Sequence, residues 1–172
     1  MDIKELVTTL NGTQYKNDPN DKKKIELIRK HLKTEYVSYN AKIDICSNIL
    51  KASRYHNVND KQVYSPNGPL EYELKIISII QVYYDFELKD GLERIEDFDL
   101  LEKYNISSLL IEGIKNEYIK LNAIYNMMAE DISYKESLIP YIDSRISSLG
   151  VVNTQWLNVF SEYLEKTKAQ EE

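Results

Sequence analysis

The sequence predicts an all-α protein: a single domain built as an irregular bundle of about six to eight helices. Apolar residues recur at helical spacing along nearly the whole chain of 172 residues, whereas the alternation typical of strands is almost absent. A chain of this length can bury a substantial core without a disulfide or a metal. We therefore treat residues 1–172 as one helical domain, in which residues 1–20 could form an N-terminal arm and residues 166–172 a frayed tail.

The first third of the chain predicts three helices. The first covers Ile3–Leu10 and is closed by Asn11-Gly12, and the polar stretch 13–20 after it contains Pro19 and is typical of a loop. Either Asn20 or Asp21 can cap the second helix, whose apolar face consists of Ile25, Ile28 and Leu32. The third follows from the helical spacing of Ala41, Ile45, Ile49 and Ala52.

Two segments around the third helix are expected to be irregular. Residues 34–39 (TEYVSY) have β character and predict an extended connector, although a helix could also run through them. Residues 53–68 are dense in Asn, Asp, Pro and Gly, which predicts the longest loop of the chain. Pro69 suits the first turn of a new helix over 69–84, and this helix is apolar on two faces. We therefore expect 69–84 to be the central core helix.

The remaining segments predict five further helices. A helix over 92–104 ends at Asn105, and a short one follows at 107–114. The next begins near Asn116, and its apolar stripe is Tyr118, Leu121, Tyr125, Met128 and Ile132. Another spans 137–149, with Pro140 in its first turn and Gly150 as a C-terminal stop. A last helix is capped by Asn153 or Thr154, and its apolar face is Trp156, Val159, Phe160, Tyr163 and Leu164.

Cysteine usage and the N-terminal sequence indicate the compartment. The single cysteine, Cys46, cannot form an internal disulfide, which fits a reducing cytosol. The first residues lack the basic region and apolar run of a signal peptide, and no stretch has the roughly 18 apolar residues of a membrane span. We expect neither export nor membrane insertion.

The charge of the chain is unevenly distributed. The formal net charge is −6, which argues against general binding of nucleic acid. Residues 1–60 carry a net charge of +3 and residues 61–172 a net charge of −9. This asymmetry would suit head-to-tail association between copies or docking onto a charged partner, but solvated faces and tails produce similar imbalances.

No group of residues in the sequence amounts to an enzyme active site, so we expect no catalytic, cofactor-binding or metal-binding residues. His31 and His56 stand far apart and lack the spacing of metal ligands. Cys46 lies among apolar residues at helical spacing, which favours a structural thiol over a nucleophile. The chain contains none of the glycine-rich phosphate loops, dinucleotide fingerprints or nucleophile elbows.

An acidic segment, Asp85–Glu102, holds eight carboxylates against Lys89 and Arg94. Clustered carboxylates can bind a divalent cation, but the alternating loop that fixes such a site is missing, which favours a solvated acidic face. A carboxylate metal centre in a helical bundle would use Glu-x-x-His motifs, and none occurs. As candidate contacts with a protein partner we select Asp85, Glu87, Asp90, Glu93, Glu96 and Asp97.

Tyrosine is unusually common, with 14 residues against three Phe and one Trp. A tyrosine ring offers a large contact area at low entropic cost, which suits protein interfaces. The alternative is that an AT-rich genome inflates tyrosine usage without any function. Four tyrosines flank the irregular segments and are our candidates for interface residues: Tyr36, Tyr39, Tyr55 and Tyr64.

Four strings follow one another over roughly Tyr36–Leu149. The strings are TEYVSYNAKIDICSNILKAS, SPNGPLEYELKIISIIQVYYDFEL, DFDLLEKYNISSLLIEGI and NEYIKLNAIYNMMAEDI. They look like proteins encoded among the virion structural genes of tailed phages of low-GC bacteria. The resemblance implies a role in the head, the head–tail connector or assembly, with no catalytic residues to carry over.

Two non-enzymatic hypotheses follow, beside a third, an enzyme with a carboxylate-rich metal centre, which the missing Glu-x-x-His motifs disfavour. The first is a virion component of the head–tail connector (neck), present in the host-cell cytoplasm and then in the virion, and contacting itself as a homo-oligomer and other virion proteins. The alternative is a small acidic regulator, either an assembly chaperone or an inhibitor of a host nucleic-acid-binding or defence protein. The acidic segment motivates the second hypothesis, because it could imitate the spacing of phosphates.

Overall fold

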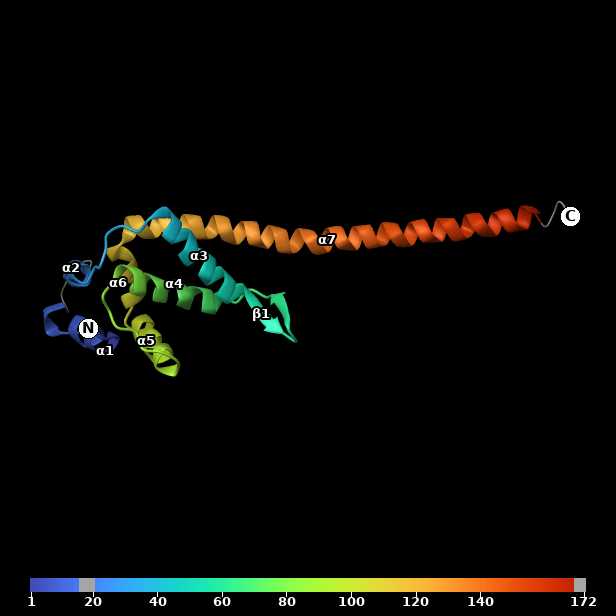
Figure 1. The fold of residues 1–172 in the computed structure, drawn as a ribbon. Helices are drawn as coiled ribbons and strands as arrows, with labels where there is room; N and C mark the ends of the chain where they lie inside the picture. Colours follow the sequence, from blue (N-terminus) through green and yellow to red (C-terminus); the bar gives the residue numbers. More distant parts are fainter. Residues whose placement is uncertain (16–20, 169–172) are drawn as a thin grey trace. The chain divides into compact units, whose positions relative to one another are not determined.

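The computed structural model describes residues 1–15 and 21–168 and confirms the all-α class. The described residues form seven α-helices, one short 3-10 helix and a two-stranded hairpin (Figure 1). In chain order these are α1 (Ile3–Leu10), η1 (Thr13–Tyr15), α2 (Lys22–Lys30), α3 (Tyr39–Arg54), β1 (Tyr55–Val58), β2 (Lys61–Tyr64), α4 (Gly68–Tyr83), α5 (Leu92–Lys103), α6 (Ile106–Gly113) and α7 (Lys115–Lys168).

The chain divides into two compact units. The first covers Met1–Ala129 and the second Glu130–Glu172, and α7 contributes residues to both. Every buried apolar side chain among the described residues belongs to the first unit. The first unit therefore has a hydrophobic core of its own.

Helix α4 lies at the centre of the first unit, as the sequence predicted. Ile76, Ile77, Ile79, Ile80 and Tyr83 are all buried, and α3 packs along the helix. Its start follows the usual rules for a helix N-terminus, because the Asn67 side chain accepts a hydrogen bond from the backbone N–H of Leu70 and proline occupies the first turn.

Helix α1 is part of this core, so the expectation of an N-terminal arm at 1–20 is wrong for its first half. Ile3 and Leu6 are completely buried, and α1 packs against α5. Asp2 and Glu5 form a reciprocal capping box that fixes the start of the helix. Most of the predicted loop at 13–20 lies outside the described residues, and Thr13–Tyr15 form η1.

The segment that follows α2 pairs with the segment that follows α4 through an antiparallel bridge between Leu32 and Tyr84. The backbone N–H of Lys33 donates to the Tyr83 carbonyl at 2.8 Å, and that of Asp85 donates to the His31 carbonyl at 3.0 Å. The hydroxyl of Tyr84 then donates to the Leu110 carbonyl at 2.6 Å. Helices α2, α4 and α6 are thereby joined around one buried tyrosine.

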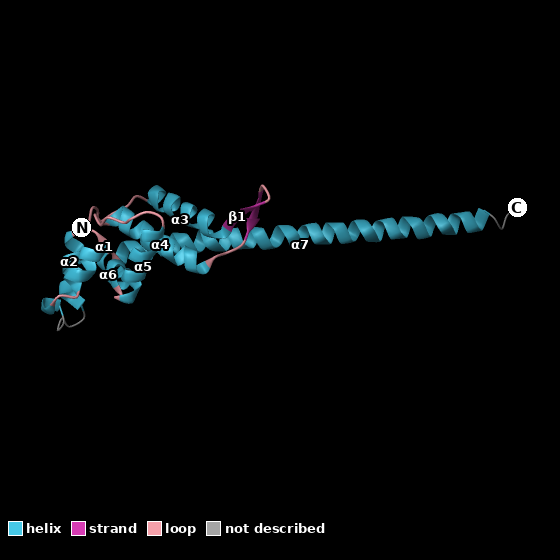
Figure 2. Cartoon of the chain, turned by 90° about the horizontal axis from the view of Figure 1, so that it is seen from below, coloured by secondary structure: helices cyan, strands magenta, loops and turns pink. Residues whose placement is uncertain are grey.

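The expected long loop at 53–68 is replaced mainly by a hairpin. Strands β1 and β2 pair antiparallel with Tyr55 opposite Tyr64 and Val58 opposite Lys61. The turn residues Asn59 and Asp60 both have positive φ, as the tight turns of two-residue hairpins require. The hairpin is drawn in magenta with its turn in pink in Figure 2. The predicted turn at these residues is confirmed, whereas the short strands on either side of it were not predicted.

Residues 34–38 are not helical, in agreement with the expected extended connector. Helix α3 begins after Ser38, whose side chain accepts a hydrogen bond from the backbone N–H of Ala41. The buried stripe of α3 is Lys42, Cys46, Ile49, Leu50 and Ser53. The predicted stripe shared only Ile49 with it, so α3 is rotated relative to our prediction.

The predicted division of the C-terminal region into three helices is wrong. Helix α7 continues through Pro140 and Gly150, and neither Asn153 nor Thr154 begins a new helix. An isolated glycine costs a helix only about 1 kcal/mol, and a proline about 3 kcal/mol, which a long helix can tolerate.

Of the predicted frayed tail at 166–172, residues 169–172 lie outside the described residues. Within the described ranges, no helix has the length and apolarity needed to cross a membrane.

Candidate interaction surface

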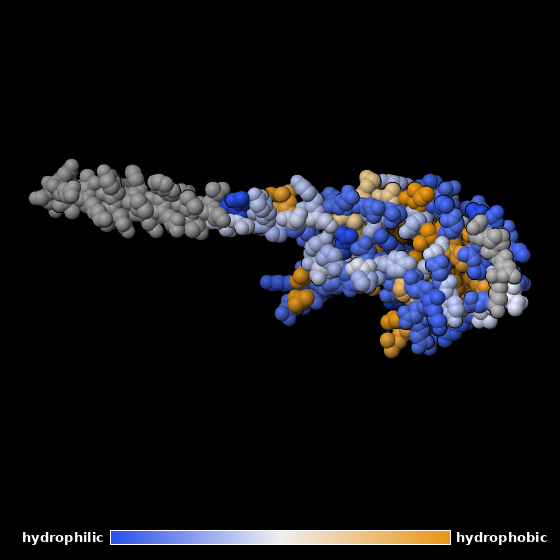
Figure 3. Space-filling model, turned by 180° about the vertical axis from the view of Figure 1, so that it is seen from behind, coloured by the Kyte–Doolittle hydropathy of each residue, from blue (hydrophilic) through white to orange (hydrophobic). Residues whose placement is uncertain are grey.

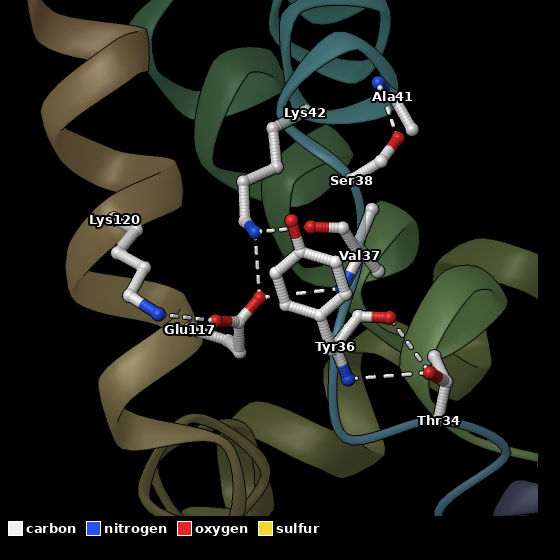
Figure 4. A network of polar contacts seen from close by, with 8 residues as sticks. All are labelled: Thr34, Tyr36, Val37, Ser38, Ala41, Lys42, Glu117 and Lys120. Atoms are coloured by element: carbon white, nitrogen blue, oxygen red, sulfur yellow. Dashed lines mark hydrogen bonds and ion pairs between the residues drawn. The ribbon is translucent and has the colours of Figure 1, made fainter.

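A buried ion pair joins α3 to the start of α7. The Lys42 ammonium lies 2.6 Å from Glu117 Oε2, and both side chains are less than a tenth exposed (Figure 4). The backbone N–H of Val37 donates to the same carboxylate oxygen at 3.3 Å, while Lys42 also donates to the Val37 carbonyl. Glu117 therefore holds the connector before α3 as well as α3 itself.

The surroundings of Glu117 stabilise its charged form. Burial by itself would raise the pKa of this carboxyl, but hydrogen bonds from Lys120, Lys42 and the Val37 N–H outweigh it and lower the pKa from 4.5 to about 2. Lys120 donates to the other carboxylate oxygen at 2.8 Å. Glu117 is thus ionised at any physiological pH.

Tyr36 on this anchored connector and Tyr39, the first residue of α3, form what we call the tyrosine surface. Their side chains are 65% and 62% exposed, on either side of the buried Val37. The Thr34 hydroxyl fixes the backbone of Tyr36, since it accepts a hydrogen bond from the Tyr36 N–H and donates one to the Tyr36 carbonyl (Figure 4). Two large exposed rings on a fixed backbone can bind a partner with little loss of conformational entropy.

The other two predicted tyrosines lie on the hairpin. Tyr55 and Tyr64 are half-buried and directly opposite each other, with ring centroids 5.5 Å apart in an edge-to-face arrangement. Much of their apolar surface therefore stabilises the hairpin. They belong to a different element from the tyrosine surface, so the structure does not join the four predicted tyrosines into one patch.

The acidic segment is mostly exposed, with one exception among the predicted residues. Five carboxylates lie on the surface: Asp85, Glu87, Asp90, Glu93 and Glu96. Asp97 is only 1% exposed, because it lies one turn before Leu101 on the buried face of α5. Its Oδ2 accepts a long hydrogen bond of 3.4 Å from the Lys89 N–H. A partner in solution could contact the first five residues but not Asp97.

Three of the exposed carboxylates already have basic neighbours. Asp85 lies 2.8 Å from His31, Glu93 lies 3.5 Å from Lys89, and Glu96 lies 3.9 Å from Lys4. Exposed pairs of this kind contribute little to stability and separate easily. They still reduce the negative potential of the segment. Figure 3 shows a mainly hydrophilic surface with scattered hydrophobic patches.

The cysteine and the histidines that the sequence analysis weighed as a nucleophile or as metal ligands lie apart from one another. Cys46 is fully buried, and burial raises the pKa of its thiol to about 11, so the thiolate is scarce at neutral pH. His56 contacts the Ser65 carbonyl at the base of the hairpin. Within the described residues, no three His, Cys, Asp or Glu side chains are placed to share a metal ion.

A second polar network, which the sequence did not reveal, joins α3, α4 and α7. Arg54 donates two hydrogen bonds of 3.2 Å to Glu71 and one of 3.1 Å to the Ala129 carbonyl. Lys75 lies 3.8 Å from Glu71, and its ammonium is 3.5 Å from the centroid of the Tyr125 ring. These contacts join residues up to 75 positions apart, and no local sequence pattern could have indicated them.

A pocket of about 420 Å³ lies between α2, α6 and the start of α7. Two of its charged lining groups are already engaged, since Arg29 donates to the Gly113 carbonyl at 3.1 Å and Lys115 lies 2.9 Å from Glu112. The pocket therefore does not offer a set of free groups converging on a ligand.

Comparison with known proteins identifies no relative: no family model, curated protein or solved structure matches the chain.

Proposed function

We propose that this chain is a non-enzymatic structural protein that acts through protein–protein contacts, as a phage virion component of the head–tail connector region. It is made in the host-cell cytoplasm and then incorporated into the virion, where it contacts other copies of itself and other virion proteins. The resemblance of Tyr36–Leu149 to small helical phage proteins supports the assignment to the particle.

The tyrosine surface is the observation that carries the interaction role. Tyr36 is exposed on the connector and Tyr39 at the start of α3, and the buried Lys42–Glu117 pair holds both segments in place. Tyrosine is enriched among the interface residues that contribute most of the binding energy, and a fixed backbone lowers the entropic cost of binding.

Mass spectrometry of purified particles tests the proposal. The copy number of this chain is measured relative to the major shell protein in particles from the source organism's lysate. A constant count of a few to a few dozen copies per particle is expected. Absence from particles would overturn the virion role.

Incorporation of variants tests the surface itself. Tyr36→Ala/Tyr39→Ala should lower the number of copies per particle, whereas Tyr104→Ala, which removes a tyrosine that is also exposed, should not. Equal incorporation of both variants would remove the tyrosine surface from the proposal.

The second candidate function is an acidic regulator of assembly or of a host nucleic-acid-binding or defence protein. The exposed carboxylates of the acidic segment favour it, and five of these seven were predicted as contacts. Replacing these five with amides, as Asp85→Asn, Glu87→Gln, Asp90→Asn, Glu93→Gln and Glu96→Gln together, should then abolish capture of the target. A control with five exposed carboxylates changed elsewhere carries Glu26→Gln, Glu35→Gln, Asp44→Asn, Glu130→Gln and Asp131→Asn, and should retain capture. Binding that survives the first set of changes would exclude mimicry.

A further inference from the structure

The part of α7 in the second unit carries a seven-residue repeat of apolar residues. With the repeat lettered a to g from Ile132 at position a, eight of the ten a and d positions from 132 to 163 are apolar. The a positions are Ile132, Ile139, Ile146, Asn153 and Phe160, and the d positions are Lys135, Ile142, Leu149, Trp156 and Tyr163. We call these ten positions the heptad stripe.

The opposite side of the helix is polar. Its b, c and f positions hold mainly Ser, Thr, Asn, Gln and Glu, and among the described side chains these are Ser133, Ser137, Ser144 and Ser147. Two tyrosines, Tyr134 and Tyr141, are the large exposed apolar residues at the described c positions. The helix is therefore amphipathic with one defined stripe.

The period of the stripe distinguishes a coiled coil from an ordinary surface helix. A straight α-helix has 3.6 residues per turn, so a strict seven-residue repeat drifts around it by about 20° per heptad. Over the four and a half heptads from 132 to 163 this drift reaches roughly 90°, which would take the stripe away from a flat partner surface. A left-handed supercoil with another helix removes the drift and keeps the stripe at one interface.

Ile132 is half-buried, whereas the other two described apolar side chains of the stripe are exposed. Ile142 is 43% exposed and Ile146 is 62% exposed. We infer that copies of this chain associate through the heptad stripe as a parallel, in-register coiled coil. This inference rests on the proposed role in subunit contacts and specifies the segment that makes them.

The polar positions in the stripe identify the partner as the same chain in parallel orientation. In a parallel, in-register assembly each position meets itself, and an asparagine at position a can pair with the asparagine of the next copy, which also fixes the register. An antiparallel assembly centred on the stripe would place Asn153 against Ile142 and Lys135 against Phe160. Each polar group would then face an apolar one, at the cost of an unpaired buried amide or charge.

Lys135 is also compatible with the parallel arrangement. It lies at the start of the stripe, its ammonium is 2.6 Å from Asp131, and Glu136 follows it in the sequence. These carboxylates offset the charge of neighbouring copies. In the later heptads the e and g positions are also apolar, namely Val152, Leu157, Val159 and Leu164. A stripe of this width is typical of bundles of more than two helices, so we expect at least three copies.

Sedimentation equilibrium of the full chain tests the inference. The wild-type chain should sediment as an oligomer whose fraction grows with concentration. Ile142→Lys/Ile146→Lys places two charges in the stripe and should raise the dissociation constant by more than about a hundredfold. Tyr141→Lys/Ser144→Lys introduces the same charges on the same stretch of helix at positions c and f, and should leave association unchanged.

The only tryptophan of the chain, Trp156, lies at a d position and provides an independent signal. Its emission should shift to longer wavelength in the Ile142→Lys/Ile146→Lys variant and should stay unchanged in the Tyr141→Lys/Ser144→Lys variant. A wild-type chain that is monomeric at every concentration would overturn the inference. Equal association of the two lysine variants would overturn it as well.

Disulfide trapping tests the orientation. Ile132→Cys should crosslink two copies under oxidation only if they are parallel, because antiparallel copies would hold these positions about 45 Å apart. Ser137→Cys at position f should not crosslink, and the buried Cys46 should not interfere. Failure of Ile132→Cys to crosslink in an associated chain would overturn the parallel arrangement.

The outcomes separate this inference from the proposed function. A monomeric chain that is nevertheless present in particles would overturn the coiled coil alone. An oligomeric chain that is absent from particles would overturn the virion role alone.

Discussion

A single carboxylate determines how the tyrosine surface is held. Glu117 accepts hydrogen bonds from Lys42, Lys120 and the Val37 N–H, and so joins the start of α7 to residues 37–42, which are far away in the sequence. A buried ion pair contributes little net stability compared with an apolar pair, but losing one partner is costly, because the other charge remains buried. The Lys42–Glu117 pair thus acts mainly as a positional constraint on the connector.

Replacing Glu117 with glutamine should destabilise the first unit strongly. Lys42 would remain buried without a counter-charge, so we expect the free energy of unfolding to fall by about 3–5 kcal/mol. Urea denaturation at neutral pH measures this change. The matched control is Glu112→Gln, which removes an exposed partner of Lys115 and should change stability by less than about 1 kcal/mol. Similar effects of the two substitutions on stability would contradict the role of the Lys42–Glu117 pair in holding the connector.

The same carboxylate predicts how stability depends on pH. Its pKa is about 2 in the folded protein and 4.5 ordinarily, so the folded state favours the ionised form. The stability that it contributes is fully present above about pH 4.5 and is lost as the pH falls towards 2. We therefore expect the difference in unfolding free energy between wild type and Glu117→Gln to be smaller at about pH 3 than at pH 7. A difference that stays constant over this range would show that the charge of Glu117 is not responsible.

Helices and strands could be predicted where local sequence features mark their ends. Helices α1, α4, α5 and α6 begin and end within about two residues of their predicted limits, because capping residues and turn formers mark their ends. The hairpin was missed because its strands have only four residues each, too few to show alternation. The Asn59-Asp60 turn was the one signal that could have indicated it.

The candidate site was less predictable than the elements. Tyr36 and Tyr39 were selected from sequence and are exposed, but their anchor was not foreseen, since Lys42 and Glu117 are 75 residues apart. Charged residues are rarely buried, so both residues were assumed to be solvated. Asp97 was misplaced for the same reason. In α7 the assumption that Gly150 ends a helix followed local propensity, which the surrounding helical sequence overrides.

The packing of α6 against Tyr84 leads to a prediction at the scale of elements. A Cβ added at Gly113 would lie 2.4 Å from the Tyr84 hydroxyl, which is fixed by its hydrogen bond to Leu110. Gly113→Ala should therefore lower the free energy of unfolding by about 1–3 kcal/mol. Tyr84→Phe removes this hydroxyl, and the nearest remaining atoms, at 3.5 and 3.6 Å, are in ordinary contact.

The double variant Tyr84→Phe/Gly113→Ala should consequently be more stable than the sum of the single effects implies, by at least about 1 kcal/mol. Urea denaturation of the four proteins closes this double-mutant cycle. Additive effects would show that the alanine does not meet the tyrosine hydroxyl.

At the scale of the whole molecule, we expect the first unit to provide the stability of the fold and the second unit to provide self-association. The buried apolar residues of the described chain all belong to Met1–Ala129. A chain ending at Ser137 should therefore keep a cooperative unfolding transition. The same chain should lose the self-association that the heptad stripe provides.

The thiol of Cys46 reports on this truncated chain. Burial keeps it inaccessible and raises its pKa to about 11, so it should react with a disulfide reagent no faster than in the full chain. Unfolded protein in urea provides the reference for fast reaction. Rapid labelling of the truncated chain without urea would show that the first unit needs the rest of α7 to fold.

The hairpin offers a place for insertion. Asn59 and Asp60 are exposed at its tip, and the core residues of α3 and α4 lie beyond the paired strands that lead to it. Exposed tips of this kind tolerate added sequence, because few packed contacts depend on them. An epitope or a small fluorescent domain placed between these two residues would label the protein while both of its ends stay native. Such a label could locate the chain in particles by electron microscopy.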